Sequence, residues 1–168
     1  MFRVEEYVLH GTDGVCRVSD ICPSPLGGEG EYYLLEPVEG TSNAKIYTPV
    51  AGGKVKMRRI MTDEEARALI VQIPGLPPLD VDNEKKRKDV YRTILQTCDP
   101  AEYVRLIKTV YRRRQELAER KKKLPESDVN ADRYVRTCLY RELSLALGVE
   151  YDRMEEYLVD AIERRLEA

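Results

Sequence analysis

The chain has 168 residues, of which 28 are basic and 30 acidic, and its formal net charge is −2 at pH 7. It holds no apolar run near the ~20 residues that a membrane span requires, which excludes a membrane-spanning protein. Its first twenty residues carry acidic side chains and no long apolar stretch, so we expect no signal peptide and a cytoplasmic location.

The cysteines and the single histidine give no metal-binding pattern. The four cysteines are Cys16, Cys22, Cys98 and Cys138, and none of them forms a C-x-x-C pair. A structural zinc site usually needs closely spaced pairs of ligands. We therefore expect reduced thiols, no metal and no cofactor, and we expect His10 to be an ordinary residue at the end of a strand.

The first sixty residues predict short β-strands separated by glycine and proline. The expected strands are VEEYVL, VCRVSDI, EYYLLE, AKIYTPV and KVKMRRI. Each is rich in Val, Ile or Tyr, and five such strands in so short a stretch are typical of a small barrel of the SH3 or Tudor type. Gly11 and Gly14 are expected to permit positive φ or close packing at a corner of this barrel.

A helix and a proline-rich segment follow the strands. Thr62 and Glu65 have the spacing of a capping box, which predicts a helix to about Ile73. The sequence PGLPPL (74–79) cannot continue a helix and is interpreted as a linker or hinge. The predicted domains are therefore a β domain with one trailing helix (1–73), a linker (74–81) and a helical domain (82–168).

The helical domain contains several start and stop signals. Asp82 or Asn83 can cap a helix that ends near Thr97, and Asp99 before Pro100 predicts the start of the next. The following helix stops at Gly148, and a last one begins near residue 152. The overall prediction is an α+β protein, with an N-terminal SH3/Tudor-like β-barrel before a C-terminal all-α bundle.

Positive charge is concentrated in the middle of the chain. Residues 84–123 carry 14 basic and 6 acidic side chains, a balance of +8, whereas residues 1–80 have a balance of −4 and residues 124–168 of −5. The basic runs are KKRK (85–88), YRRRQ (111–115) and RKKK (120–123). Antiparallel packing of two helices would bring the first run near the last, and such a cluster suits nucleic-acid phosphates. The alternative is a solvated face with i,i+4 ion pairs, such as Glu116 with Arg120.

The strand AKIYTPV can form an open edge of the β domain, to which a partner could add a strand. An edge that is merely protected by Lys45 and Pro49 fits the same spacing. The chain contains no P-loop, no G-x-S-x-G and no H-E-x-x-H motif, so we do not expect an enzyme. An unfamiliar carboxylate site is the remaining enzymatic alternative.

Two sets of motifs resemble a known family. In the first half they are YVLHGTDGVCRVSDI (7–21), YYLL (32–35), YTPV (47–50) and MRRIMTDEEA (57–66), and in the second half ILQTCDP (94–100), VYRRRQ (110–115) and YRELSLALG (140–148). The first set resembles the RNA-polymerase-interacting domain of the CarD family, which the transcription-repair coupling factor shares, and the second resembles the CarD helical domain. The resemblance implies a bacterial transcription regulator that binds the polymerase β subunit and contacts promoter DNA near the opening bubble, without cofactor or covalent chemistry.

The resemblance also implies site residues. Matched by motif, the polymerase-binding strand is nearest Ile46, Tyr47 and Thr48. The DNA-binding residues correspond to Lys85, Lys86, Arg87, Lys88, Arg112, Arg113 and Arg114.

Two departures from the family pattern stand out. Family members have a tryptophan at the start of the first helix of the helical domain. The matching position in this chain is Glu84 or a residue next to it, and the chain contains no tryptophan. Basic residues that some relatives present from the β domain are replaced by Tyr47 and a residue near Ser24. The alternative function is therefore a polymerase-binding adaptor without DNA contact. A monomer and a pair joined through the sheet edge both remain open.

Overall fold

The computed structural model describes residues 1–40 and 43–167. The chain divides into two compact units, Met1–Ile60 and Met61–Ala168, which are called here the β unit and the helical unit. Each is described by itself.

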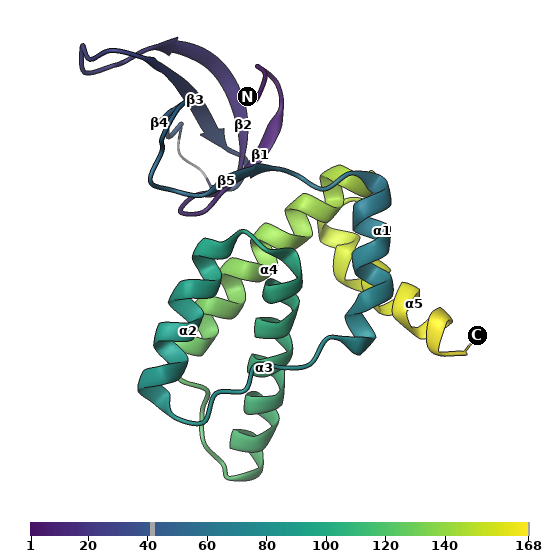
Figure 1. Cartoon of the computed structure of the whole chain (residues 1–168). Helices are drawn as coiled ribbons and strands as arrows, with labels where there is room; N and C mark the ends of the chain where they lie inside the picture. Colours follow the sequence, from purple (N-terminus) through teal and green to yellow (C-terminus); the bar gives the residue numbers. More distant parts are fainter. Residues whose placement is uncertain (41–42, 168) are drawn as a thin grey trace. The chain divides into compact units, whose positions relative to one another are not determined.

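The β unit is one antiparallel sheet of five strands (Figure 1). The strands are β1 (Tyr7–His10), β2 (Gly14–Pro23), β3 (Glu31–Pro37), β4 (Ile46–Pro49) and β5 (Met57–Arg59). Their order in the sheet is β4-β3-β2-β1-β5, so among the described residues β4 and β5 each pair on one side only. The predicted α+β class is confirmed, whereas closure into a barrel is not, because closure would require the two outer strands to pair.

The turn between β1 and β2 uses its two glycines differently. Gly14 has a φ of 76°, a conformation that glycine adopts without a steric penalty. The N–H of Gly11 instead donates to the carbonyl of Lys56 at 2.9 Å, which ties the end of β1 to the start of β5. His10 ends β1 as predicted, and its Nδ1 lies 2.8 Å from the carboxylate of Asp13. The turn between β1 and β2 therefore lies next to the start of β5 and brings these three strands together.

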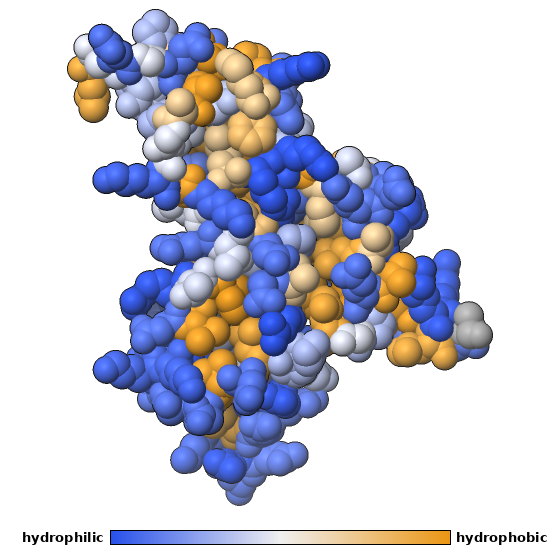
Figure 2. All heavy atoms as spheres, viewed as in Figure 1, coloured by the Kyte–Doolittle hydropathy of each residue, from blue (hydrophilic) through white to orange (hydrophobic). Residues whose placement is uncertain are grey.

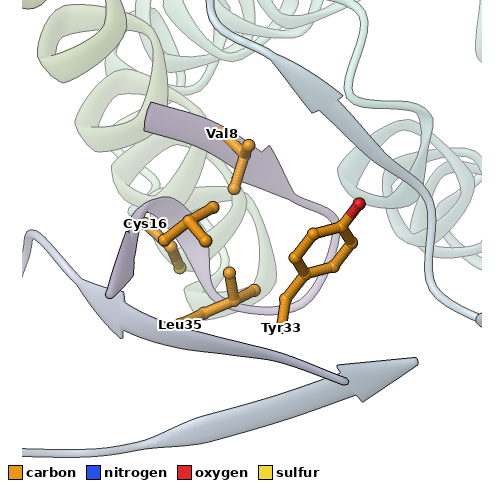
Figure 3. Close-up of a cluster of buried hydrophobic side chains, with 5 residues drawn as sticks. Val8, Cys16, Tyr33 and Leu35 are labelled. Atoms are coloured by element: carbon orange, nitrogen blue, oxygen red, sulfur yellow. The ribbon is translucent and has the colours of Figure 1, made fainter. Parts of the chain in front are cut away.

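The core of the β unit lies on one face of the curved sheet. Alternate residues of β1, β2 and β3 point toward one another there, as Figure 3 shows for Val8, Cys16, Tyr33 and Leu35. The hydroxyl of Tyr33 accepts a hydrogen bond from the N–H of Phe2 at 2.9 Å. In β3 the buried residues alternate with more exposed ones, as the side-chain period of two predicts, whereas Val8, Leu9 and His10 of β1 are buried in succession.

The helical unit contains five helices and two short 3₁₀ turns. They are α1 (Asp63–Gln72), η1 (Ile73–Gly75), α2 (Glu84–Thr97), α3 (Pro100–Glu119), α4 (Glu126–Leu147), η2 (Tyr151–Arg153) and α5 (Met154–Glu167). The predicted helix starts are confirmed, because Thr62, Asn83 and Asp99 all accept a hydrogen bond from the first turn of their helices. Gly148 ends α4 with a φ of 68°. None of the helices in the described ranges is long and apolar enough to cross a membrane.

The helix α1 packs against α4 and α5 (Figure 1). The β domain predicted from the sequence extends to residue 73 and so includes α1, whereas the contacts of α1 group it with the helices that follow. The physical reason is its apolar face, since Ala66, Leu69 and Ile70 are all buried in the helical unit.

The proline-rich segment 74–79 is fastened to α3 rather than free. The Nε of Arg105 donates to the carbonyl of Pro77 at 3.1 Å, and the N–H of Leu79 donates to Thr109 Oγ1 at 2.7 Å. Lys108 Nζ donates to the carbonyls of Ile73 and Leu76, and burial lowers the pKa of this lysine. Lys108 and Thr109 follow Arg105 by three and four residues, so both lie on the helix face that carries Arg105. The segment interpreted from sequence as a linker or hinge is therefore a strap within the helical unit.

Candidate functional site

The main-chain groups of β4 divide between β3 and the open side of the strand. The N–H of Val50 donates to the carbonyl of Glu31 at 2.9 Å, which marks a hydrogen-bonded pair of this ladder. Such pairs alternate with non-hydrogen-bonded pairs along an antiparallel ladder, so the register places Ile46 and Thr48 in further hydrogen-bonded pairs. The N–H and carbonyl of Tyr47 therefore point away from β3.

The side chains of β4 follow the same division. Tyr47 is 44% exposed, whereas Thr48 is only 7% exposed and Ile46 is half-buried against the core of the β unit. Pro49 has no N–H, so it adds an acceptor but no donor to the open side. The structure places all three predicted docking residues in an edge strand, but Tyr47 alone presents both its side chain and its main-chain groups outward.

The other edge strand, β5, is covered by its own arginines. Two hydrogen bonds show which residue pairs of β1 and β5 are hydrogen-bonded: Gly11 N–H donates to the Lys56 carbonyl, and Ile60 N–H donates to the Tyr7 carbonyl. Such pairs alternate with non-hydrogen-bonded pairs, so the N–H and carbonyl of Arg59 point away from β1. Nη1 of Arg58 donates to this outward carbonyl of Arg59 at 2.9 Å. Charged side chains on an edge oppose the addition of another strand. The β4 edge is therefore the more open of the two.

Two of the predicted DNA-binding arginines lie inside the helical unit. The carboxylate of Asp128 is fully buried near the start of α4, and its Oδ1 lies 3.0 Å from Nε of Arg113 and 3.7 Å from Nε of Arg87. The hydroxyl of Tyr91 donates to the same oxygen at 2.8 Å. Burial, together with the neighbouring carboxylate, raises the pKa of Tyr91.

This Asp128 cluster joins α2, α3 and α4. Arg87 is only 6% exposed and Arg113 is partly buried, so their charge is directed at Asp128 rather than at solvent. Asp128 was not predicted as a site residue, because its partners Tyr91 and Arg113 lie 37 and 15 residues away. In the structure, these two arginines link α2 and α3 to Asp128 of α4 and so stabilise the bundle.

The remaining predicted DNA-binding residues are exposed. Lys86 lies 3.9 Å from Asp82, Lys88 lies 3.4 Å from Glu84, and Arg112 lies 3.9 Å from Glu116. Exposed pairs at such distances hold their cations weakly. Among the described residues, the remaining two predicted cations have no acidic partner; they are Lys85 and Arg114.

A second group of cations lies in the turn between α3 and α4. Residues 120–123 (RKKK) are all exposed, and none has an acidic partner within the described part of the chain. Lys121 has a φ of 55°, and the N–H of Lys122 donates to the carbonyl of Leu117 at 2.8 Å, so a tight helix end presents these side chains. The pair suggested from sequence, Glu116 with Arg120, does not form, because Glu116 pairs with Arg112 instead.

The two groups of cations lie at one end of the helical unit. The helices α2 and α3 are in contact and antiparallel, so the start of α2 and the end of α3 lie at the same end, as predicted (Figure 1). Figure 2 shows hydrophilic side chains over much of this end. We call the exposed cations at this end that have no acidic partner among the described residues the free-cation end; they are Lys85, Arg114, Arg120, Lys121, Lys122 and Lys123.

Comparison with known proteins identifies the N-terminal part of the chain. Residues 2–61 match the family model of the CarD-like/TRCF RID domain. The match ends where the β unit ends, within one residue. A comparison with curated proteins found no match.

Proposed function

Since residues 2–61 form a CarD-like/TRCF RID domain, we propose that this protein binds bacterial RNA polymerase, on its β subunit, through the β unit. We further propose that the helical unit contacts promoter DNA and thereby modulates the stability of the open complex at initiation. The protein acts by binding alone, without catalysis, as a regulator of transcription associated with the nucleoid through polymerase.

The observation that carries the polymerase part is the open β4 edge in a domain of this family. An extended segment of the partner adds to this edge and bonds to the outward N–H and carbonyl of Tyr47. Ile46 and Thr48 hold β4 in the sheet, since their main-chain groups are hydrogen-bonded to β3. Pro49 limits the addition to a short segment, because it offers no donor.

The observation that supports DNA contact is the free-cation end. Its six exposed cations have no acidic partner in the described part of the chain, so phosphates can bind them without displacing a carboxylate. Such contacts are independent of sequence and weaken with salt. Lys86, Lys88 and Arg112 add to this surface when phosphates displace their exposed carboxylate partners, whereas Arg87 and Arg113 position the helices from within.

The absence of tryptophan shapes the proposed contact. Glu84 is the first residue of α2 and is exposed. The resemblance places the family's tryptophan within about a residue of it. An anionic side chain there cannot unstack a base step as an apolar wedge does. The contact proposed here is therefore made to phosphates in or beside the minor groove.

A charge-reversal experiment tests the DNA part. We expect Lys122→Glu with Lys123→Glu to abolish the effect of the protein on open-complex lifetime while polymerase binding is retained. The matched control is Arg164→Glu with Arg165→Glu, which makes the same change in net charge on exposed residues of α5. Equal effects of both double variants, or no effect of the first, would contradict a local phosphate contact.

The second candidate function, a polymerase-binding adaptor without DNA contact, is favoured by Glu84 and the missing tryptophan. Salt titration of the polymerase–promoter complex, with and without this protein, separates the two. Each phosphate contact makes the slope of log K against log salt more negative by about 0.9. An unchanged slope would favour the adaptor.

A further inference from the structure

Tyr111 is an aromatic side chain of the helical unit that is not buried in its core. It is 57% exposed, whereas Tyr103 on the same helix is 1% exposed and Tyr91 of α2 is 3% exposed. Aromatic side chains bury a large apolar area where a fold uses them for packing. The ring of Tyr111 is therefore available for contact with a partner.

The hydroxyl of Tyr111 is tethered to the next turn of α3. Nε2 of Gln115 donates to this hydroxyl at 2.9 Å. Residues three, four and seven positions apart share a helix face, so Arg114, Gln115 and Ala118 lie on the same side of α3 as Tyr111. All four residues are exposed. This face therefore presents an aromatic ring beside a cation that belongs to the free-cation end.

The charge of this surface indicates what kind of partner the ring meets. Arg114 follows Tyr111 by one turn, and Arg120 follows it by nine residues, roughly 13 Å along the helix axis. One strand of DNA covers that distance in about four nucleotides. A cationic surface that also carries an exposed aromatic ring is the combination by which proteins hold single-stranded nucleic acid, with phosphates on the cations and a base on the ring.

A base can stack on Tyr111 only when it is unpaired. In a duplex each base is covered on both faces by its neighbours, whereas phosphates are accessible in paired and melted DNA alike. A ligand with equal affinity for two states shifts no population between them, so phosphate contact alone gives little preference for the open promoter. Stacking on an exposed ring supplies such a preference.

We propose that Tyr111 stacks on an unpaired base of melted promoter DNA, and that this contact makes the helical unit prefer melted to paired DNA. The inference rests on the proposed function, in which the free-cation end binds the phosphates of the same strand. Stacking of one base on an aromatic side chain raises affinity by about five- to a hundredfold.

The test measures binding of the full chain, at low salt, to two DNA probes: a fully paired duplex, and the same duplex with a central stretch of unpaired bases. We expect the wild type to bind the second probe about five- to a hundredfold more tightly. Tyr111→Ala should lose this preference while its affinity for the duplex stays within about twofold of the wild type. Tyr111→Phe keeps the ring and should keep the preference. The control is Val159→Ala, which shortens a 48% exposed apolar side chain of α5 and should change neither affinity.

A fluorescent base analogue in the unpaired stretch reports the stacking itself, since its emission is quenched when it stacks. Quenching by the wild type and by Tyr111→Phe, but not by Tyr111→Ala, is expected. Equal affinity of the wild type for both probes, or a preference that survives in Tyr111→Ala, overturns the inference and leaves the phosphate contact standing. Lys122→Glu with Lys123→Glu should weaken binding to both probes alike, which distinguishes loss of phosphate contact from loss of stacking. Binding of the wild type to neither probe would refute the proposed DNA contact together with the role of Tyr111.

Discussion

Replacement of Tyr47 with proline removes one main-chain donor from the open side of β4. Because Tyr47 occupies a non-hydrogen-bonded position of the β3–β4 ladder, the change breaks no hydrogen bond inside the β unit. Proline is tolerated on edge strands for this reason. One hydrogen bond to the added strand is worth about 0.5–1.5 kcal/mol, so the affinity for polymerase should fall about two- to tenfold, with a further loss from the tyrosine ring.

Two control variants separate the main-chain contribution from the rest. Tyr47→Ala removes the ring and keeps the N–H, so Tyr47→Pro should bind more weakly than Tyr47→Ala by the value of the hydrogen bond. Thr48→Pro removes an N–H that β3 uses and should lower the thermal stability of the protein, whereas Tyr47→Pro should not. The assay is titration of polymerase with the labelled full chain, alongside thermal unfolding. Equal affinities of the proline and alanine variants at position 47 would refute strand addition at this edge, and unfolding by Tyr47→Pro would refute the assigned phase of the ladder.

Three further predictions concern the helical unit. Replacing Asp128 with Asn should destabilise it by about 3–5 kcal/mol in urea unfolding, because two arginines lose their buried counter-charge. The raised pKa of Tyr91 stabilises the fold fully below pH 10.0, the ordinary value for this group, and its contribution is lost as pH rises from there toward the higher folded pKa. Stability should accordingly fall by up to about 1.4 kcal/mol per pH unit above pH 10, and Tyr91→Phe should remove this component in unfolding curves at pH 9–11. Lys108→Met should loosen the strap and speed amide exchange in residues 73–79, because two carbonyls lose their donor; unchanged exchange there would contradict the role given to this lysine.

The features that were predictable from the sequence are those with local causes. A helix cap depends on residues two or three positions apart, so Thr62, Asn83 and Asp99 could be assigned as helix starts without knowing their tertiary contacts. The alternation within β3 and the positive φ of Gly14 are local in the same sense. The alternating pattern of β4 agreed with its place at an edge of the sheet. Which of its main-chain groups point away from β3 could be determined only from the register between the two strands.

The features that were missed depend on residues far apart in the chain. Proline and glycine in segment 74–79 do end a helix, but composition cannot show that Arg105, Lys108 and Thr109 bond to that segment. Arg87 has the same side chain as the exposed cations beside it, and only its distance to Asp128 reveals that it is a buried brace. A run of basic residues on a helix therefore predicts a charged surface only for those members that the helical period turns outward.

The same distinction changes the expected strength of DNA binding. With Arg87 and Arg113 directed at Asp128, the proposed DNA contact depends on exposed lysines and arginines, whose phosphate bonds weaken steeply with salt. The β4 edge, ended by Pro49, likewise offers only a short ladder to a partner. Two weak contacts become effective together when the link between them is short, since effective concentration falls as a flexible linker lengthens. Both proposed contacts belong to one chain, and on the proposed function this explains how the protein can act at promoters while binding free DNA poorly.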